Sequence, residues 1–325
     1  MKVKALGLFS GGLDSILAVK LIQKQGIDVK LVNFTTPFFP PEKAIKMANQ
    51  IKVPLKVIDI TKDYLKLLKK PKYGYGSALN PCIDCKIFML KKAKKYAKRI
   101  GAKFIFTGEV LGERPMSQTK NALTLIEKEA KLKGKLLRPL SAKLLPVTEA
   151  EKKWVDRNKL LDIQGRKRDK QIKLAKTFGI KNYPSPSGGC LLTNKEYAAK
   201  VKDLLTYKKT ITINDLKLLK IGRHFRFKNN KIIVGRNKDE NKELIKLKKS
   251  SDYIFEVPNV GSPITILQGP KSKKAIALAA QLTLRYSDAK EKAFVKYGKR
   301  NLTNSILIEK IKDSEINKLR ITFSS

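Results

Sequence analysis

The sequence predicts an α/β protein in which a doubly wound parallel sheet is followed by a smaller C-terminal α+β domain. Three observations lead to this fold class. Apolar, β-rich runs alternate with helix-like stretches over the first hundred residues, a glycine-rich turn joins the first run to the first helix, and the last third of the chain contains hairpin patterns instead. Buried parallel strands are typically continuous apolar runs separated by helices, whereas hairpins place a short turn between two strands.

The expected strands of the first domain lie at residues 3–9, 29–35, 55–60 and 103–108. Helices are expected to begin near Leu13 and Pro41, and a lysine-rich helix is expected over residues 84–100, after a loop at 71–81 that is rich in Gly, Pro and Tyr. Thr148 and Glu151 have the spacing of a capping box. Residues 166–178 predict a strongly basic helix, and residues 183–189 are rich in helix breakers. We therefore place the end of the first domain, residues 1–193, near Thr193.

The second domain, residues 194–325, has a different pattern. Residues 225–235 predict a β-hairpin in which Asn229 and Asn230 supply the turn. Residues 253–257 and 263–267 predict further strands, and a helix is expected over residues 273–284. Together these elements predict a small α+β module.

The composition of the chain is strongly basic. Lys and Arg number 71 against 28 Asp and Glu, a net charge of +43, and the excess is spread over both domains. A lysine-rich surface without a specific partner is the alternative explanation, but thermophilic surfaces usually raise Glu together with Lys. The charge therefore favours a polyanionic partner, with RNA or DNA ahead of a membrane surface.

Hydropathy and cysteine content indicate a cytoplasmic protein. No run approaches the roughly 20 apolar residues of a membrane span, and the chain enters its first strand without an apolar signal region. We expect no membrane partner. The 3 cysteines provide no disulfide framework, and an odd number in a reducing compartment favours metal ligands or a reactive site.

The turn Ser10-Gly-Gly-Leu-Asp-Ser15 predicts an anion site. A strand that ends in Ser-Gly-Gly directly before a helix points backbone N–H groups and the positive end of the helix at one place, and glycine lets a phosphate approach closely. The alternative is a tight turn whose glycines only permit positive φ. The Gly-Lys-Ser/Thr pattern of P-loop NTPases is not present.

This turn resembles the PP-loop of the ATP-pyrophosphatase superfamily, which has an adenine nucleotide α-hydrolase-like fold. The resemblance implies that ATP is held here, that its pyrophosphate is released and that AMP is transferred to a substrate oxygen. It also implies an Mg²⁺ ion organised by Asp14. The nucleotide-binding residues that it implies are Ser10, Gly11, Gly12, Asp14, Ser15, Asn33, Phe34, Thr107 and Gly108, with the adenine near Asn33 and Phe34.

Two further segments resemble tRNA thiolation enzymes. The segment Thr107-Gly-Glu-Val-Leu-Gly…Ser-Gln-Thr119, followed by Leu137-Arg-Pro-Leu140, is similar to segments of ThiI-type tRNA 4-thiouridine synthases. The segment Asn80-Pro-Cys-Ile-Asp-Cys85 is similar to a loop of MnmA-type tRNA 2-thiouridylases. The resemblance covers about residues 1–193 and implies a PP-loop enzyme that acts on tRNA.

Cys82, Cys85 and Cys190 are the candidate catalytic residues and metal ligands, together with Asp14 as a catalytic residue. Each cysteine lies beside turn-forming residues. A structural Zn²⁺ site needs four ligands, and only His224 in the other domain could be the fourth. Three cysteines fit a four-iron four-sulfur cluster with one open iron, as the resemblance to cluster-dependent tRNA thiolases also implies. The competing hypotheses are a persulfide on Cys190 that Cys82 resolves, and three buried cysteines without chemistry.

The remaining candidates are weaker. His224, the only histidine, is expected to be structural or to face RNA, and Trp154 is expected in the core. A basic group is expected to contact tRNA phosphates or to form a solvated helix face; it consists of Arg157, Arg166, Arg168, Lys170 and Lys173. The stretch Ile233-Val-Gly-Arg-Asn237 resembles the RNA-binding NFACT-R domain.

Taken together, these patterns predict an ATP-dependent tRNA sulfurtransferase that adenylates a uridine carbonyl and replaces its oxygen with sulfur. Its expected partners are tRNA and a sulfur donor, either sulfide or a cysteine desulfurase. Two alternatives stay open: a PP-loop ligase that acts on a small molecule, and a non-catalytic RNA-binding protein that retains the ATP fold.

Overall fold

The structure of the chain is a computed structural model that describes residues 2–184 and 189–323. The chain forms two compact units, Met1–Thr193 and Asn194–Ser325. Part of the predicted breaker-rich segment, residues 185–188, lies outside the described residues. Within the described residues, no helix is both long enough and apolar enough to cross a membrane.

The described part of the first unit contains a parallel sheet of five strands in the order β3-β2-β1-β4-β5. The strands are β1 (Lys4–Leu8), β2 (Asp28–Thr35), β3 (Leu55–Asp59), β4 (Phe104–Thr107) and β5 (Leu136–Leu137). All four pairings are parallel. The predicted doubly wound sheet is confirmed, and β5 is an additional strand that its two-residue length kept out of the sequence prediction.

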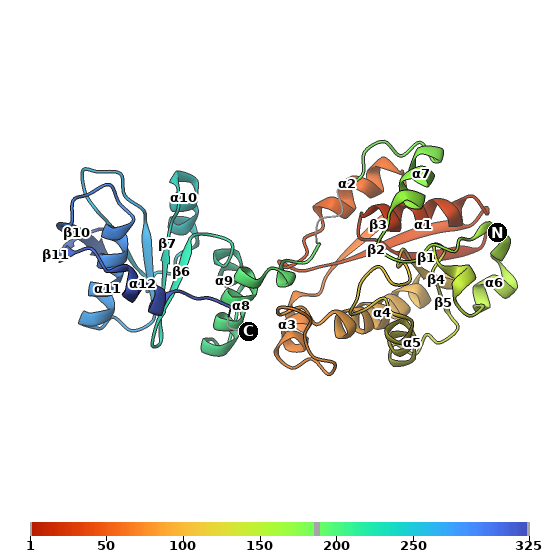
Figure 1. Cartoon of the computed structure of the whole chain (residues 1–325), viewed down its shortest axis with the longest axis horizontal. Coiled ribbons are helices and arrows are strands. Elements are labelled where there is room, and N and C mark those ends of the chain that lie inside the picture. The colour runs from red at the N-terminus through yellow and green to blue at the C-terminus, as the bar shows by residue number, and fades with distance from the viewer. Residues whose placement is uncertain (1, 185–188, 324–325) are drawn as a thin grey trace. The chain divides into compact units, whose positions relative to one another are not determined.

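Helices cover both faces of this sheet. In Figure 1, α1, α2 and α7 lie on one side and α3, α4 and α5 on the other. The helices of this unit are α1 (Leu13–Gln23), α2 (Glu42–Gln50), α3 (Thr61–Lys69), α4 (Cys82–Arg99), α5 (Lys120–Glu129), α6 (Glu149–Lys153) and α7 (Asp169–Thr177). α1 is buried around most of its circumference, as expected for a helix between a sheet and a second helix. The predicted capping box of Thr148 and Glu151 begins α6.

Two helices begin at residues other than those predicted. α4 begins at Cys82 instead of residue 84, so that Cys82 and Cys85 lie on its first turn. α7 begins at Asp169 instead of residue 166. Gly165 is in the left-handed region at φ +81°, and its N–H donates to the Leu111 carbonyl at 2.7 Å. This hydrogen bond ties the chain just before Arg166 to Leu111, and α7 begins only after Arg168.

Close backbone contacts hold the turn between β1 and α1 in place. Gly11 has φ +75°, and a Cβ atom on it would lie 2.6 Å from the Lys43 carbonyl oxygen at the start of α2. A Cβ atom on Gly108, directly after β4, would lie 2.5 Å from the Ser15 backbone nitrogen. Real Cβ atoms do not approach backbone this closely, so both positions require glycine.

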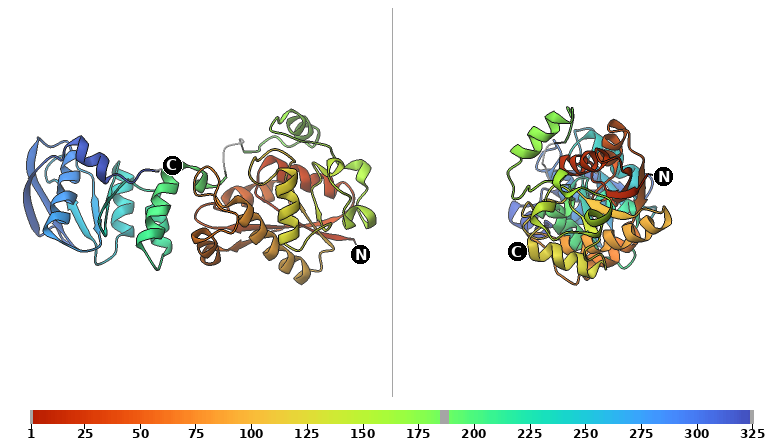
Figure 2. Two further views of the ribbon diagram at one scale, coloured as in Figure 1. Left: turned by 60° about the horizontal axis from the view of Figure 1, so that its bottom comes forward. Right: turned by 90° about the vertical axis from the view of Figure 1, so that its right-hand side faces the viewer.

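The described part of the second unit contains an antiparallel sheet of six strands in the order β11-β10-β8-β9-β7-β6. The strands are β6 (Arg223–Phe227), β7 (Asn230–Val234), β8 (Tyr253–Glu256), β9 (Thr265–Gln268), β10 (Lys292–Gly298) and β11 (Asn304–Glu309). β11, in dark blue, lies at one edge of this sheet (Figures 1 and 2). The helices are α8 (Lys195–Tyr207), α9 (Ile213–Leu218), α10 (Lys238–Leu247), α11 (Lys273–Arg285) and α12 (Asp313–Leu319). The predicted α+β module is confirmed, with α8, α9, α10, α12, β10 and β11 in addition.

Both faces of β7, the strand next to the edge strand β6, are buried. Ile232 and Val234 belong to the core cluster beneath α11, whereas Ile233 belongs to a second cluster with Leu244 of α10. This alternation follows from the period of two along a strand. Burial of both faces explains why residues 232–234 are all apolar, whereas strands of antiparallel sheets commonly alternate apolar and polar residues.

The predicted hairpin turn is one residue too late. Phe227 pairs with Asn230, so Lys228 and Asn229 form the turn, and Lys228 has φ +49°. Asn230 is buried and begins β7, where its Nδ2 donates to the carbonyl of Pro270 at 2.5 Å. This long-range bond outweighs the local turn preference of the Asn-Asn pair.

We predict that Gly11→Ala destabilises the first unit by more than Gly26→Ala does. Both positions have positive φ, which costs about 1–2 kcal/mol for a non-glycine residue, but a Cβ atom on Gly26 would meet nothing within 4 Å. Trp154, the only tryptophan, reports on this unit alone. Urea unfolding followed by its fluorescence measures both free energies. Equal losses would contradict the close contact at Lys43.

Candidate functional site

The turn between β1 and α1 presents free backbone donors at a helix N-terminus. Gly12 is the N-cap of α1, and no side chain caps this end. The Ser10 hydroxyl accepts a hydrogen bond from the Gly12 N–H at 3.3 Å, and the Ser15 hydroxyl donates to the Gly12 carbonyl at 2.7 Å. The uncapped N–H groups and the positive end of the eleven-residue helix suit an anionic group.

Asp14 has one carboxylate oxygen that the described residues leave without a partner. Its Oδ2 lies 4.0 Å from Arg168 Nη2, and both side chains are 17% exposed. Its Oδ1 is buried and accepts no hydrogen bond within the described part of the chain. Burial raises the pKa of Asp14, although the Arg168 and Arg114 cations oppose this shift. A nearly buried carboxylate with a free oxygen fits Mg²⁺, which proteins hold with one or two carboxylates and substrate phosphates.

Other buried polar atoms near this turn also have no partner within the described residues, namely Asn33 Oδ1, Arg168 Nε and both polar atoms of the Gln171 side chain, which acts on Asp14. Asn33 lies near the end of β2, and its Nδ2 donates to the Phe9 carbonyl after β1 at 2.8 Å. In a parallel sheet the carboxyl ends of the strands meet at one edge, which is where ligands bind in open α/β folds. Phe34 is buried, so its ring contributes to the interior.

The segment after β4 is organised around the buried carboxylate of Glu109. Its Oε2 accepts from the Thr107 hydroxyl at 3.0 Å and from Arg138 Nε at 3.1 Å, and its Oε1 lies 3.2 Å from Lys86 Nζ. Arg138 also pairs with Glu127 of α5. Burial alone would raise the pKa of Glu109, but the Lys86 and Arg138 cations lower it to about 2. The buried ion pair of Glu109 and Arg138 therefore joins the segment 107–119 to the segment 137–140.

The three cysteines lie in one neighbourhood of the first unit. Cys82 and Cys85 are on the first turn of α4, and the Cys82 sulfur accepts from Asn80 Nδ2 at 3.1 Å. Burial, with a smaller contribution from the charge of Cys82, raises the pKa of Cys85 to about 11 and that of Cys190 to about 12. Burial is the main cause of a raised pKa of the Tyr64 hydroxyl, and the charges of the same three thiols add to it.

Backbone hydrogen bonds bring Cys190 to this place from a hundred residues away. The N–H of Leu191 donates to the Phe38 carbonyl at 2.9 Å, and the Leu79 N–H donates to the Leu192 carbonyl at 3.2 Å. These bonds fix the segment after Cys190 to the loop beyond β2 and to the loop before α4. Cys190 is thereby held by the same loops that present Cys82 and Cys85.

Within residues 2–184 and 189–323, no three His, Cys, Asp or Glu side chains are placed to hold one metal ion. A zinc site requires sulfurs about 2.3 Å from a single ion. A cluster ligates each cysteine to a different iron, so its sulfurs need not converge on one point. The three cysteines are thus thiol donors held by neighbouring loops, a donor type that iron–sulfur clusters use.

Lys86 connects the cysteines with the turn at Asp14. Its ammonium pairs with Glu109, and its positive charge opposes the rise in the pKa of the adjacent Cys85 thiol. Gly108, next to Glu109, contacts the backbone of Asp14 and Ser15. The predicted phosphate residues and the predicted cysteines thus belong to one continuous set of contacts.

Several side chains of the site were not singled out for it from the sequence. Arg168 was predicted to meet tRNA or solvent, but it lies beside Asp14. Tyr64, Lys86 and Glu113 carry no local signal apart from the place of Glu113 in the segment 107–119. Burial and then the charge of Asp14 raise the pKa of Glu113, which places it near the turn.

Other predicted residues lie elsewhere. Arg157 pairs with Glu151 and donates to the Leu145 carbonyl, so it stabilises the start of α6. His224 is 2% exposed and its Nε2 donates to the Ile221 carbonyl at 2.7 Å, so it does not face RNA. Burial lowers its pKa well below the usual value. Trp154 stacks on Phe104 at 6.1 Å between ring centroids, against the core.

We predict that Glu109→Gln destabilises the first unit by about 3–5 kcal/mol at neutral pH, because Arg138 and Lys86 lose their buried counter-charge. The lowered pKa of Glu109 means that its ionisation stabilises the folded state above the unfolded pKa, near pH 4.5, and that this contribution is lost as the pH falls towards 2.

The wild type should therefore lose stability between about pH 5 and pH 2 more steeply than Glu109→Gln, as measured by Trp154 fluorescence in urea. Glu149→Gln is the control, because Glu149 is a surface partner with a 44% exposed side chain. Parallel stability–pH curves for the wild type and Glu109→Gln would refute the assigned ion pair.

Comparison with known proteins divides the chain in the same way. Residues 1–143 match the family model of the thiamine biosynthesis protein (ThiI), and residues 222–320 match the model of the NFACT protein RNA binding domain. Among solved structures, a 4-thiouridine synthetase–RNA complex with bound ATP is similar at 23% identity and a TM-score of 0.35, covering 55% of this chain and 52% of that one.

Curated relatives match part of the first unit. A probable tRNA sulfurtransferase of Thermococcus kodakarensis is 33% identical over 144 residues, which cover 42% of this chain and 36% of that protein. A probable tRNA sulfurtransferase of Ureaplasma parvum is 34% identical over 134 residues, which cover 38% and 33%. The chain thus spans about a third of the length of these relatives. It combines one domain that matches the ThiI family with a second that matches the NFACT RNA-binding domain.

Proposed function

We propose that the chain is an ATP-dependent tRNA sulfurtransferase. The observation that carries this proposal is the set of contacts from Cys85 through Lys86 and Glu109 to the turn at Asp14. It supports sulfur chemistry and nucleotide chemistry within the same unit. The matches to ThiI and to probable tRNA sulfurtransferases support the same activity.

The reaction has two steps in this proposal. A uridine carbonyl oxygen attacks the α-phosphorus of ATP, and pyrophosphate leaves. A sulfur nucleophile then attacks the activated carbon, and AMP leaves with the former carbonyl oxygen. The first step needs charge neutralisation at the phosphates and the second needs sulfur close to the same base.

The turn from Ser10 to Ser15 supplies the groups for the first step. Its uncapped helix N-terminus attracts the phosphates. Asp14 would hold Mg²⁺ through the oxygen that has no partner in the described residues, and Arg168 is placed to contact a phosphate oxygen. Asn33 Oδ1, also without a partner there, can accept a hydrogen bond from the base or ribose.

The cysteines supply the sulfur site. Cys82, Cys85 and Cys190 would hold a four-iron four-sulfur cluster, which when bound offers one open iron to an external sulfide. The raised thiol pKa values mean that Cys85 and Cys190 are protonated at neutral pH until coordination removes the proton. The Tyr64 hydroxyl lies near these thiols, and Lys86 contributes a nearby positive charge.

The second unit would bind the tRNA. Its match to an RNA-binding domain and the net charge of +43 support this role, because phosphate contacts by Lys and Arg dominate the affinity for nucleic acids. The proposal includes sulfide or a cysteine desulfurase as the sulfur donor.

We predict that Asp14→Asn lowers tRNA-stimulated release of pyrophosphate from ATP by about a hundredfold or more, because a neutral amide binds Mg²⁺ poorly and does not offset its charge. Asp162→Asn is the matched control: Asp162 has a 60% exposed side chain and pairs with Lys170. Trp154 fluorescence checks folding. Unchanged release from a folded Asp14→Asn protein would refute nucleotide binding at this turn.

We predict that protein purified without oxygen contains about four irons per chain, the content of the proposed cluster. Replacing Cys82, Cys85 or Cys190 by Ser should remove iron and tRNA thiolation together, because a cluster needs all three ligands. Iron analysis and mass spectrometry of tRNA nucleosides measure the two effects. If Cys85→Ser alone still thiolates tRNA without iron, a persulfide on Cys190 resolved by Cys82 replaces the cluster.

A further inference from the structure

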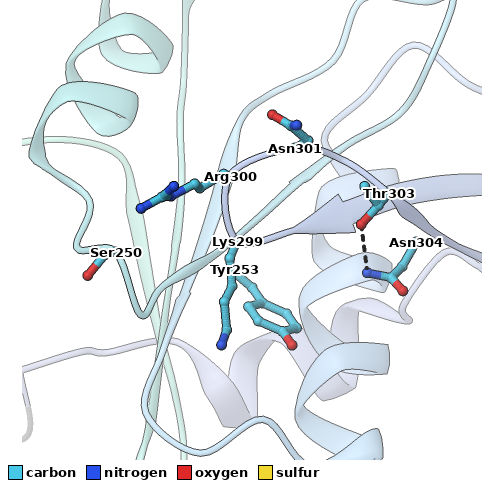
Figure 3. A pocket seen from close by; sticks show the side chains of 7 residues that line it. All are labelled: Ser250, Tyr253, Lys299, Arg300, Asn301, Thr303 and Asn304. Atoms are coloured by element: carbon cyan, nitrogen blue, oxygen red, sulfur yellow. Dashed lines mark hydrogen bonds between the residues drawn. The ribbon is translucent and has the colours of Figure 1, made fainter.

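The second unit contains an open pocket of about 520 Å³. It lies between the start of β8 and the turn that joins β10 to β11 (Figure 3). The lining residues are Ser250, Tyr253, Lys299, Arg300, Asn301, Thr303 and Asn304. Its volume lies within the range of about 300–1,000 Å³ that is usual for small-molecule sites, so one nucleotide can enter it.

The pocket is positively charged. Lys299 and Arg300 are exposed, and neither forms an ion pair within the described residues. Figure 3 shows the Lys299 side chain beside the Tyr253 ring and the Arg300 guanidinium extending towards Ser250. Lys271 adds a third cation: its ammonium lies 5.3 Å from the centroid of the Tyr253 ring and donates to the Leu267 and Gly269 carbonyls. None of the seven lining residues is acidic, and the nearby Asp252 is buried and accepts a hydrogen bond from Gln268 Nε2, so the charges exposed at the pocket are positive.

Tyr253 supplies an aromatic wall next to these cations. Its ring is half-buried and lies 6.0 Å from the Tyr297 ring, centroid to centroid. The strand pairing of β8 with β9 and β10 fixes its backbone. An aromatic ring held by a sheet beside free cations is the combination that proteins use for unpaired bases, which stack on the ring while cations hold the phosphates.

The other lining residues can contact a base or ribose. Asn301, Thr303, Asn304 and Ser250 offer amide and hydroxyl groups at the rim of the pocket. Within the described residues the side-chain amide of Asn304 makes only long contacts of 3.4 Å, to the Thr303 hydroxyl and the Tyr297 carbonyl. Such groups can reach the edge of a base or the 2′-hydroxyl that distinguishes RNA from DNA.

We propose that this pocket binds one unpaired nucleotide of RNA, with the base against Tyr253 and the phosphate on Lys299 and Arg300. The inference rests on the proposed RNA-binding role of the second unit and makes it specific to single-stranded segments. A paired base cannot enter the pocket, because in a duplex its faces are covered by its neighbours. Duplex RNA would meet only the cations at the rim.

The test compares a single-stranded oligoribonucleotide of about ten nucleotides, within the range of known single-strand sites, with a duplex of equal length. Fluorescence anisotropy with the full chain measures both affinities. Tyr253→Leu should weaken binding of the single strand about tenfold, the scale of one lost stacking contact. Tyr253→Phe should restore it, and neither change should alter duplex binding.

Arg300→Ala provides a second test that leaves the packed Tyr253 in place. It should weaken single-strand binding and reduce the slope of log affinity against log salt by about 0.7, the value for one phosphate contact on a single strand. Lys202→Ala is the control, because it removes an equal charge from an exposed position on α8 outside the pocket. It should leave that slope and the single-strand affinity unchanged.

Equal losses for single strand and duplex, or equal effects of Arg300→Ala and Lys202→Ala, would overturn the pocket proposal while RNA binding by the unit stands. If the wild-type protein binds neither RNA, the RNA-binding role itself is refuted.

Discussion

The buried carboxylate of Glu109 is the group on which the arrangement of the first unit depends. It joins the end of β4 to Arg138 after β5 and to Lys86 on α4. An unpaired charge in this place would cost several kcal/mol, so the three elements remain together in the folded state. The neighbouring Gly108 is thereby pressed against the backbone of Asp14 and Ser15. A single ion pair thus fixes the distance between the turn at α1 and the helix that carries two of the cysteines.

The buried polar groups of this unit differ in how they are paired. Glu109 Oε1 accepts no hydrogen bond within the described residues, but it lies in an ion pair with Lys86 at 3.2 Å. Glu109 and Arg157 have buried or half-buried ionic partners and hold elements in place. Asp14, Asn33 and Arg168 instead each keep a buried polar atom for which the described residues offer no partner. Because a buried polar atom without a hydrogen bond is costly, such atoms at the edge of a parallel sheet are best explained by a ligand that completes them.

The second unit shows the same contrast among its cations. Lys231 and Arg226 are both paired with Asp203, and burial lowers the pKa of Lys231 to about 8. These two cations are held by Asp203 inside the unit. Lys299 and Arg300 project from a hairpin turn beside Tyr253, without ionic partners in the part of the chain that the structure describes. In the proposed RNA-binding role the basic residues would therefore contribute unequally, because only exposed, unpaired cations can exchange their counterions for phosphates.

The sequence by itself determined the features that depend on neighbours along the chain. The four apolar runs predicted the strands β1 to β4, the Ser-Gly-Gly turn predicted a helix that begins near Leu13, as α1 does, and the spacing of Thr148 and Glu151 predicted the capping box of α6. Only the tertiary structure decided which distant groups meet. It placed Arg168 beside Asp14, brought Cys190 to α4 and moved the hairpin turn to Lys228 and Asn229. The physical reason is that propensities and caps act within a few residues, whereas ion pairs, buried thiols and backbone contacts at glycine depend on the packing of segments a hundred residues apart.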